Sequence, residues 1–323
     1  MIVAKNLSKA FGNVQAVNSM SFHITKGETV GLIGANGAGK TTLIRMMCGL
    51  LKPSSGFVRV FRTNPVEHTR NVGRRLGIVL GSGQLSYVAY STPGRNYVNL
   101  QSDLTLKNNF ENIKSIYRIS KEEYNQRLSE LCSILDIRDY FDYRVSQLSL
   151  GQCMRAEIAA VLLYEPELLV LDEPYIGIDI MAKRAISQML KTLSVKKETT
   201  IILTTHNVEE IESVCSRVIL LDGGNMVYNG TLDRLKTAHA GINALSVKIA
   251  GAIPDLQDLP VIRYTIENDS IKIWYDSNAL HSKDITNFIL SQTSMTDLLI
   301  SKPSVEEVLK NIYKGDKNER YNN

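Results

Sequence analysis

A nine-residue stretch near the start of the chain constrains its fold more than any other feature. It reads Gly34-Ala35-Asn36-Gly37-Ala38-Gly39-Lys40-Thr41-Thr42. This order fits the phosphate-binding loop pattern G-x-x-x-x-G-K-[ST], which requires a strand before it and a helix after it. The apolar residues 28–33 and the helical pattern of residues 40–48 meet both requirements. The alternative is a glycine-rich turn that binds nothing.

The chemistry of this loop follows from its residue types. Glycines let the main chain bend around a chain of phosphates so that successive N–H groups point inward, and the helix N-terminus adds partial positive charge. The pattern assigns Lys40 to the β- and γ-phosphates and the hydroxyl of Thr41 to Mg²⁺. The sequence therefore predicts a site for a nucleoside triphosphate with its metal ion.

The composition is typical of a soluble globular protein with a proper core. The chain has 323 residues, enough for two domains, with 44% hydrophobic and 22% charged residues. The formal net charge of +4 is too small to favour a nucleic-acid partner, and none is expected. Four cysteines, at positions 48, 132, 153 and 215, suit neither a zinc site nor a disulfide framework. Reduced thiols in a cytosolic compartment are expected.

We expect that the chain does not cross a membrane by itself. Residues 1–5 do not start the long apolar stretch of a secretion signal. The best candidate for a span, residues 158–171, is interrupted by Glu165, Pro166 and Glu167. A spanning helix needs about 18 or more consecutive apolar residues.

The order of strand and helix patterns predicts the fold class. Short apolar runs alternate with helical segments, which favours a mostly parallel sheet covered on both faces. A hairpin is expected around residues 222–225. The helix with Leu128, Leu131, Cys132 and Leu135 on one face is expected to pack in the core. The pattern of residues 81–102 predicts a long loop or insertion.

Beyond Lys236 the pattern changes to a smaller mixed unit. Strands are expected at residues 245–249, 262–266, 271–275 and 298–300, with helices near residues 285–290 and 305–313. The expected domains are residues 1–236, with a helical subdomain at about 84–163, then an α+β unit at 237–313 and a polar, disordered tail at 314–323.

An acidic pair follows a buried strand pattern further along the chain. Asp172 and Glu173 come directly after the apolar residues 168–171. Such a pair suits a Mg²⁺ partner at Asp172 and a base that polarises water at Glu173. A carboxylate that caps the next helix is the alternative.

Three weaker signals accompany this pair. Ser149 and Gly151 stand at a helix start that can face an anion, although ordinary capping explains them equally. His206 follows the strand pattern of residues 201–205, where a histidine can donate to a terminal phosphate or be structural. Residues 177–179 predict a turn, for which a surface loop is the alternative.

Taken together and in this order, these elements resemble the nucleotide-binding subunit of an ATP-binding cassette (ABC) transporter. The resemblance covers about residues 1–236. It implies the cassette fold of a P-loop NTPase, an α/β fold with a mostly parallel core sheet, an antiparallel β subdomain and a helical subdomain. The C-terminal unit resembles the small α+β accessory domain of exporter-type relatives.

The resemblance also implies roles for single residues, with ATP and Mg²⁺ as cofactors. Glu173 is the expected catalytic base, Asp172 assists Mg²⁺, and His206 senses the γ-phosphate. Ser149, Gly151 and Gln152 belong to the signature that closes over the ATP of a second subunit, where Asp179 also lies. Phe11 matches the aromatic residue that stacks on adenine, with a simple core phenylalanine as the alternative.

Three departures from the family pattern stand out. The signature has Leu150 where glycine is common, a variant similar to that of drug and polysaccharide exporters. Tyr175 stands where many relatives have threonine or serine. The glutamine expected to complete the Mg²⁺ shell is displaced, with Gln84 as the candidate and Gln101 as a poorer one. The stretch 81–102, the family's coupling surface, is either shaped for a membrane partner or a decorative loop.

The partners implied are transmembrane permease subunits encoded separately, and a homodimer or a heterodimer with a related cassette. The location implied is the cytoplasmic face of the membrane, as a peripheral protein that powers export.

Two other functions stay open at this stage. A soluble cassette acting on ribosomes or DNA would show two phosphate loops or a long coiled coil, and this sequence has one loop and no such heptads. A regulatory subunit without turnover would not need the intact Glu173 and His206.

Overall fold

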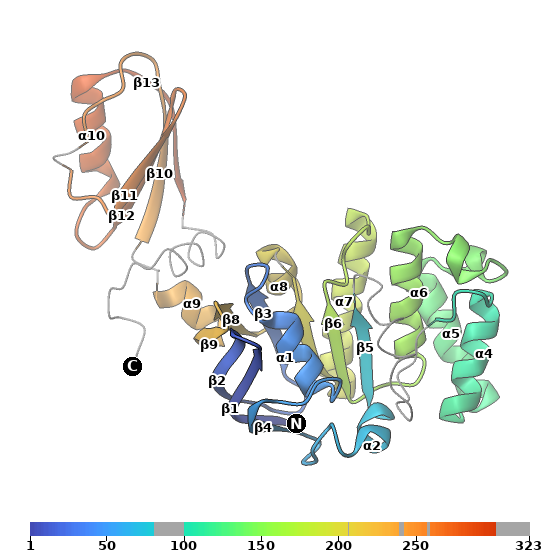
Figure 1. The fold of residues 1–323 in the computed structure, drawn as a ribbon. Coiled ribbons are helices and arrows are strands. Elements are labelled where there is room, and N and C mark those ends of the chain that lie inside the picture. Colours follow the sequence, from blue (N-terminus) through green and yellow to red (C-terminus); the bar gives the residue numbers. More distant parts are fainter. Residues whose placement is uncertain (81–99, 206, 239–241, 257–258, 302–323) are drawn as a thin grey trace. The chain divides into compact units, whose positions relative to one another are not determined.

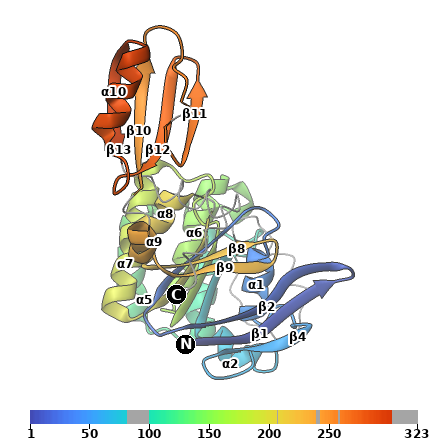
Figure 2. The same cartoon turned by 90° about the vertical axis from the view of Figure 1, so that its left-hand side faces the viewer.

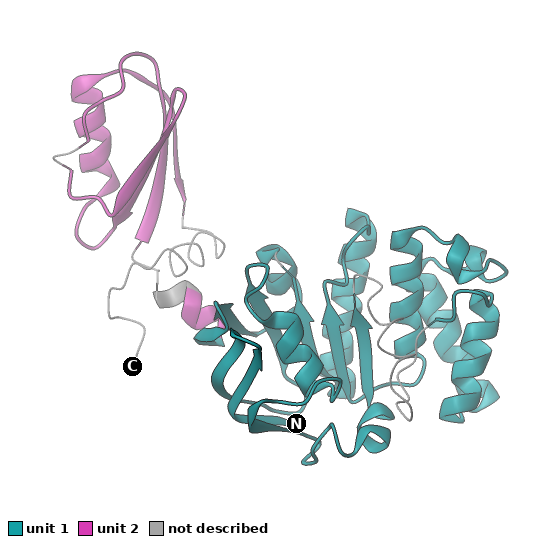
Figure 3. Cartoon of the chain, in the orientation of Figure 1, with its two compact units in different colours: residues 1–230 teal, residues 231–323 magenta. Residues whose placement is uncertain are grey.

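The computed structural model describes residues 1–80, 100–205, 207–238, 242–256 and 259–301. The chain divides by its packing into two compact units, residues 1–230 and 231–323 (Figure 3). The sequence pattern put the first boundary at Lys236, which lies within helix α9 (Leu232–Ala238). Each unit has its own sheet or sheets and its own core.

The first unit is built around a six-stranded sheet with the order β5-β6-β7-β3-β8-β9 (Figure 1). Its strands are β3 (Thr29–Gly34), β5 (Leu76–Leu80), β6 (Leu168–Asp172), β7 (Thr200–Thr204), β8 (Arg217–Asp222) and β9 (Asn225–Thr231). The pairs β5–β6, β6–β7, β7–β3 and β3–β8 are parallel. Every residue of β3, β5, β6 and β7 is buried, because helices cover both faces.

The expected hairpin joins β8 to β9 through Gly223 and Gly224. Both glycines have positive φ, +50° and +81°, as the tight turns of β-hairpins favour. The turn that sets the edge strand β9 beside β8 therefore has two positions whose backbone conformation only glycine adopts without strain.

Helices pack on opposite faces of β3. Leu32 shares a core with Leu43 and Ile44 of α1 (Lys40–Met47). Gly31 points to the other face, where an added Cβ would lie 2.6 Å from Ile211 of α8 (Val208–Val214). The remaining helices of this region are α2 (Thr69–Gly73) and α7 (Ile180–Lys197).

A separate antiparallel sheet, β2-β1-β4, lies against α1 (Figure 2). Its strands are β1 (Ile2–Phe11), β2 (Val14–Ile24) and β4 (Ser55–Val60). Its inward apolar residues share the core of the main sheet. This is the antiparallel β subdomain that the resemblance implied.

Beyond the edge strand β5 lies a helical part (Figure 1). It consists of α4 (Leu106–Tyr117), α5 (Lys121–Leu135) and α6 (Leu150–Leu162), with short 3₁₀ turns at Arg138–Tyr140 and Val145–Gln147. The expected stripe of α5 is confirmed for Leu131, Cys132 and Leu135, which are buried, whereas Leu128 is only partly buried. The ring of Phe110 meets that of Phe141 edge-on, with centroids 5.7 Å apart.

The second unit holds a four-stranded antiparallel sheet, β11-β12-β10-β13. Its elements are β10 (Ile242–Ile249), β11 (Arg263–Glu267), β12 (Ser270–Asp276), α10 (Ser282–Gln292) and β13 (Met295–Ser301). Ile285 and Ile289 of α10 complete its core. The expected helix at 305–313, the tail and most of the expected 81–102 loop lie outside the described residues. Among the helices that the structure describes, none has the length and hydropathy of a membrane span.

The packing of the helical part can be tested at Phe110. This side chain is 0% exposed, whereas Ile116 on the same helix is 58% exposed. Phe110→Ala removes a fully buried ring, and we expect a loss of about 3 to 5 kcal/mol in the free energy of unfolding. Ile116→Ala should change it by less than about 0.5 kcal/mol. Urea denaturation followed by circular dichroism measures both, and equal losses would contradict this packing.

Candidate nucleotide site

The glycine-rich loop connects β3 to α1 in a conformation that needs its glycines. Gly37 and Gly39 have φ of +83° and +100°. An added Cβ at Gly39 would lie 2.3 Å from the main-chain oxygen of Ala16. The loop curls around its own lysine, because Lys40 Nζ donates to Gly34 O at 2.7 Å and Ala35 O at 3.1 Å.

The start of α1 is prepared for an anion from outside the chain. The first N–H groups of any helix lack intrahelical acceptors. Here the N-cap is Gly39, which makes no side-chain cap, and the first turn has no acidic residue. The helix therefore offers its N–H groups and the positive end of its dipole to a bound phosphate.

Two oxygen ligands suited to a hard cation meet beside this loop. Thr41 Oγ1 donates to Asp172 Oδ2 at 3.2 Å, and Thr204 Oγ1 donates to Asp172 Oδ1. Strand register places Asp172 opposite Thr204, at the carboxyl ends of β6 and β7. Mg²⁺ prefers few protein ligands, with phosphate and water oxygens completing its shell. In the described part of the chain no group of three or more His, Cys, Asp or Glu could hold a metal. Thr41 and Asp172 fit a Mg²⁺ ion that arrives with a nucleotide.

Glu173 follows Asp172 in an unusual backbone conformation. Its φ is +53°, a left-handed conformation that costs roughly 1 to 2 kcal/mol in a residue with a Cβ. The strand β7 holds it there, because Glu173 N donates to Thr204 O at 3.0 Å and to Thr204 Oγ1 at 3.1 Å. Backbone strain of this kind is concentrated at functional sites.

The signature residues form the capped start of α6. Gln152 N donates to Ser149 Oγ at 3.3 Å, and Ser149 N donates to Gln152 Oε1 at 2.8 Å. Gly151 lies against the turn at Gly177, where an added Cβ would be 2.3 Å from Gly177 O. Leu150, the departure from the common signature, is exposed.

The turn after Gly177 leads into α7 through Asp179. Its carboxylate accepts from Ala182 N at 3.0 Å, and this hydrogen bond lowers the pKa of Asp179. The structure thus brings the signature and Asp179 to neighbouring helix starts, whereas Lys40, Thr41, Asp172 and Glu173 form a second group at the ends of β3 and β6.

Of the remaining predicted site residues, the structure describes Phe11 and Gln101 but not His206 and Gln84. Phe11 ends β1 and is 51% exposed, so the alternative of a core phenylalanine is wrong. Lys9 Nζ lies 5.1 Å from its ring centroid. His206 and Gln84 lie outside the described residues. Gln101, the second candidate for the glutamine, bonds through its main chain to Asn109 of α4.

The contacts of two residues near the site, Thr204 and Tyr175, were not predicted from the sequence. Thr204 contacts both members of the acidic pair, and only strand register reveals it. Tyr175 is buried, which raises the pKa of its hydroxyl, and it shares a hydrogen bond of 2.9 Å with Ser187 Oγ of α7. Ser213 of α8 donates to the same Ser187 oxygen at 3.1 Å. Tyr175 therefore connects the turn to α7 directly and to α8 through Ser187.

Comparison with known proteins agrees with this geometry. Residues 17–176 match the family model described as ABC transporter. The ABC transporter ATP-binding protein NatA of Bacillus subtilis is 31% identical over 239 residues, 73% of this chain and 91% of NatA. The linearmycin resistance ATP-binding protein LnrL of the same organism is 28% identical over 97% of this chain and 98% of LnrL. The Nod factor export ATP-binding protein I of Bradyrhizobium diazoefficiens is 32% identical over 78% of this chain and 76% of its own.

Solved structures match about three quarters of this chain. An ATP-binding subunit of an ABC transporter aligns with a TM-score of 0.63 and 25% identity, covering 73% of this chain and 92% of its own. The cassette MJ0796, solved as a dimer in a post-hydrolysis state bound to ADP and Pi, aligns with a TM-score of 0.61 and 26% identity. It covers 72% of this chain and 99% of its own.

The fold is therefore that of an ABC-type P-loop ATPase, as the resemblance implied. The chain belongs to the ATP-binding proteins of ABC transporters, the class of ATPases that powers transport. A cassette acting on ribosomes or DNA is not favoured by these relatives.

The backbone conformation of the loop can be tested by comparing alanine substitutions at its two glycines with positive φ, Gly37 and Gly39. The Cβ that Gly37→Ala adds would have no other atom within 4 Å. We therefore expect only the cost of the left-handed backbone conformation, a loss of about 1 to 2 kcal/mol in the free energy of unfolding. Gly39→Ala also drives its Cβ against Ala16 O and should cost at least twice as much. Urea unfolding of both variants measures the difference. A Gly39→Ala variant as stable as Gly37→Ala would contradict this loop geometry.

Proposed function

We propose that the chain binds ATP with Mg²⁺ at the loop of β3 and α1, hydrolyses it within a dimer, and powers an exporter formed by separate transmembrane subunits. The observation that supports this best is the hydrogen bond between Thr41 and Asp172. It places the hydroxyl of the phosphate-binding loop beside the carboxylate of the acidic pair, as a shared Mg²⁺ requires.

Lys40 and the start of α1 act on the phosphates. When the nucleotide binds, the ammonium of Lys40 exchanges its hydrogen bonds to Gly34 O and Ala35 O for hydrogen bonds to the β- and γ-phosphate oxygens. These oxygens carry more negative charge than the carbonyl oxygens. The N–H groups of the loop hold the same phosphates without reorganising, so they favour charge that develops in the transition state. Thr41 and Asp172 would hold Mg²⁺, which neutralises phosphate charge when bound.

Glu173 is the proposed base that orients the attacking water. Its main chain is fixed to β7 by two hydrogen bonds from one N–H, so its position relative to Asp172 is set by the sheet. Orienting a nucleophile in this way accounts for a large part of the rate in phosphoryl transfer. His206 is the proposed sensor of the γ-phosphate, and Gln84 a proposed further Mg²⁺ contact.

The signature is proposed to act on ATP held by a second cassette. That cassette is either a second copy of this chain, in a homodimer, or a related cassette, in a heterodimer. Ser149 Oγ accepts from Gln152 N, so the hydroxyl hydrogen is free to donate to a γ-phosphate. The N–H of Gly151 lies in the first turn of α6 and can donate to the same group. Asp179, beside Gly177, is proposed to lie at the same interface, and the dimeric state of MJ0796 supports this arrangement. Phe11, exposed at the end of β1, is proposed to stack on adenine.

Export at the cytoplasmic face of the membrane is proposed from the relatives. Their names describe Nod factor export, linearmycin resistance and multidrug transport. The exposed Leu150 of the signature and the second unit agree with the exporter-type branch that the sequence resembles.

The base can be tested with Glu173→Gln. The amide keeps the size of the side chain but cannot accept a proton, so ATP turnover should fall by about 10²- to 10⁴-fold. The variant should also accumulate as an ATP-bound dimer, detected by size-exclusion chromatography with light scattering. Glu122→Gln on the exposed side of α5 is the matched control. Normal turnover in Glu173→Gln would remove Glu173 from this role.

Nucleotide affinity can be tested with Lys40→Ala. Loss of a charged donor to phosphate should raise the ATP dissociation constant by roughly tenfold to a hundredfold. Calorimetry with Mg²⁺-ATP measures this constant, circular dichroism checks the fold, and Lys52→Ala is the charge-matched control. An unchanged dissociation constant for ATP in Lys40→Ala would place the nucleotide elsewhere.

A further inference from the structure

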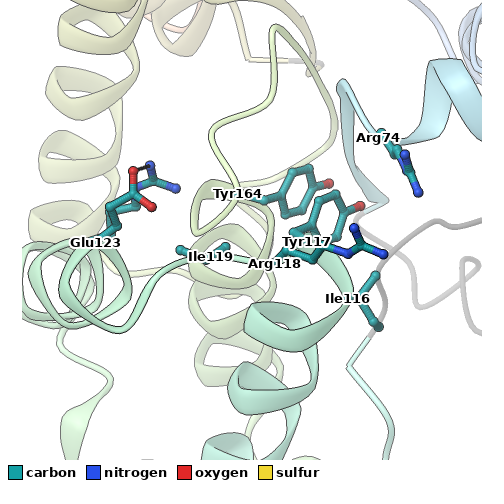
Figure 4. A pocket seen from close by; sticks show the side chains of 8 residues that line it. Arg74, Ile116, Tyr117, Arg118, Ile119, Glu123 and Tyr164 are labelled. Carbon is teal, nitrogen blue, oxygen red and sulfur yellow. Dashed lines mark hydrogen bonds and ion pairs between the residues drawn. The ribbon is translucent and has the colours of Figure 1, made fainter.

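A cavity of about 380 Å³ lies apart from the nucleotide site, between the helical part and the start of β5. It is lined by the end of α4, the start of α5, Arg74 before β5 and Tyr164 after α6 (Figure 4). Neither the phosphate-binding loop nor the signature contributes to it. The function proposed above therefore leaves this cavity unexplained.

Two stacked tyrosines form one wall of the cavity. The rings of Tyr117 and Tyr164 are 3.8 Å apart at their centroids, with planes 9° apart. Tyr164 OH donates to Leu76 O at 3.1 Å, and Tyr117 OH donates to Gly73 O at 3.5 Å. Burial raises the pKa of Tyr117 to about 12, against an opposing effect of the charge of Arg74. The wall is therefore rigid, neutral at physiological pH, and close to the Arg74 guanidinium.

The three arginines of the cavity differ in their partners. Arg127 is neutralised, with Glu165 at 3.0 Å and Glu123 at 3.5 Å, and it donates to Leu163 O at 2.9 Å. The side chains of Arg74 and Arg118 form no ion pair and no hydrogen bond with other described residues. An arginine does not lose its charge in proteins. Two positive side chains of one cavity thus have no carboxylate within ion-pair distance in this part of the chain, since Glu123, which also lines the cavity, pairs with Arg127.

Local structure holds these two side chains beside the tyrosine wall. Arg118 ends α4 in the left-handed conformation, with φ of +55°. Arg74 ends α2, two residues before β5. In Figure 4 both lie on the side to which the phenol oxygens of Tyr117 and Tyr164 point. Their guanidinium groups therefore face a common space with polar walls.

We propose that this cavity is a binding site for a phosphate group, held by Arg74 and Arg118 beside the Tyr117–Tyr164 wall. The planar guanidinium matches the spacing of two phosphate oxygens, so each arginine can donate two parallel hydrogen bonds. The volume exceeds that of a phosphate ion, which leaves room for the rest of a small phosphorylated molecule. Because Arg118 belongs to the helical part and Arg74 precedes β5, one bound phosphate would link the two.

The test separates this site from the nucleotide loop, which also binds phosphate. Inorganic phosphate is titrated into the full-length Lys40→Ala variant, whose loop is impaired, and the broadening of the ³¹P resonance is recorded. We expect saturable binding that Arg74→Gln and Arg118→Gln each weaken at least fivefold in this background. Arg59→Gln, which removes an exposed arginine from β4, should have no effect. Equal weakening by all three substitutions, or by none, would overturn the proposal.

A second arm distinguishes a soluble phosphate from a lipid headgroup. Phosphatidylcholine vesicles with and without phosphatidic acid are sedimented with the same variants. Sedimentation that needs phosphatidic acid and both arginines would assign the site to a lipid phosphate. Binding of free phosphate without such sedimentation would assign it to a soluble molecule. Circular dichroism melting curves confirm that the variants are folded. ATP turnover enters none of these readouts, so the outcome does not depend on the function proposed above.

Discussion

The geometry of the nucleotide site depends on one carboxylate at the carboxyl edge of the parallel sheet. Asp172 accepts from Thr41 at the start of α1 and from Thr204 at the end of β7. Three segments far apart in sequence therefore meet at one buried acidic group. The register of β6 with β7 fixes Asp172 opposite Thr204, and the same threonine positions Glu173 through its main chain. A shift of one residue in this register would move both acidic side chains away from the loop.

The helix starts of the first unit show how the site is kept open for phosphate. Ser120, Ser149 and Asp179 cap α5, α6 and α7 by accepting main-chain hydrogen bonds. Only at α1, among these helices, is the cap a glycine, with no side-chain acceptor. The uncapped N-terminus is less stable by itself, since a good cap contributes about 1 kcal/mol. Because no side chain caps this helix start, a bound anion can accept the hydrogen bonds of its N–H groups. The lower stability of the helix start in the free protein therefore favours anion binding.

The sequence predicted the parts of this structure that depend on local patterns. The loop of residues 34–42, the acidic pair and the strand and helix order each have a period or motif within a few residues. The contacts of Thr204 and Tyr175 were not predicted because they arise from strand register and from packing on α7 and α8. The Tyr117–Tyr164 stack joins positions 47 residues apart (164 − 117), and no local pattern indicates such a contact. Long-range pairs of this kind need the fold before they can be recognised.

Close contacts connect the start of α6, which carries the proposed signature, with helices α7 and α8. Gly151 lies so close to the turn at Gly177 that an added Cβ would be 2.3 Å from Gly177 O. The turn continues through Tyr175 to Ser187 of α7 and Ser213 of α8. Thr205, which follows β7, donates to Glu210 of α8 at 2.5 Å, and Glu210 pairs with Lys183 of α7 at 2.8 Å. A contiguous set of polar contacts therefore runs from the end of β7, beside the proposed site of the γ-phosphate, to α7. Energetic coupling between two sites can be carried by packed side chains and hydrogen bonds of this kind, and these contacts connect the proposed nucleotide and signature residues within one unit.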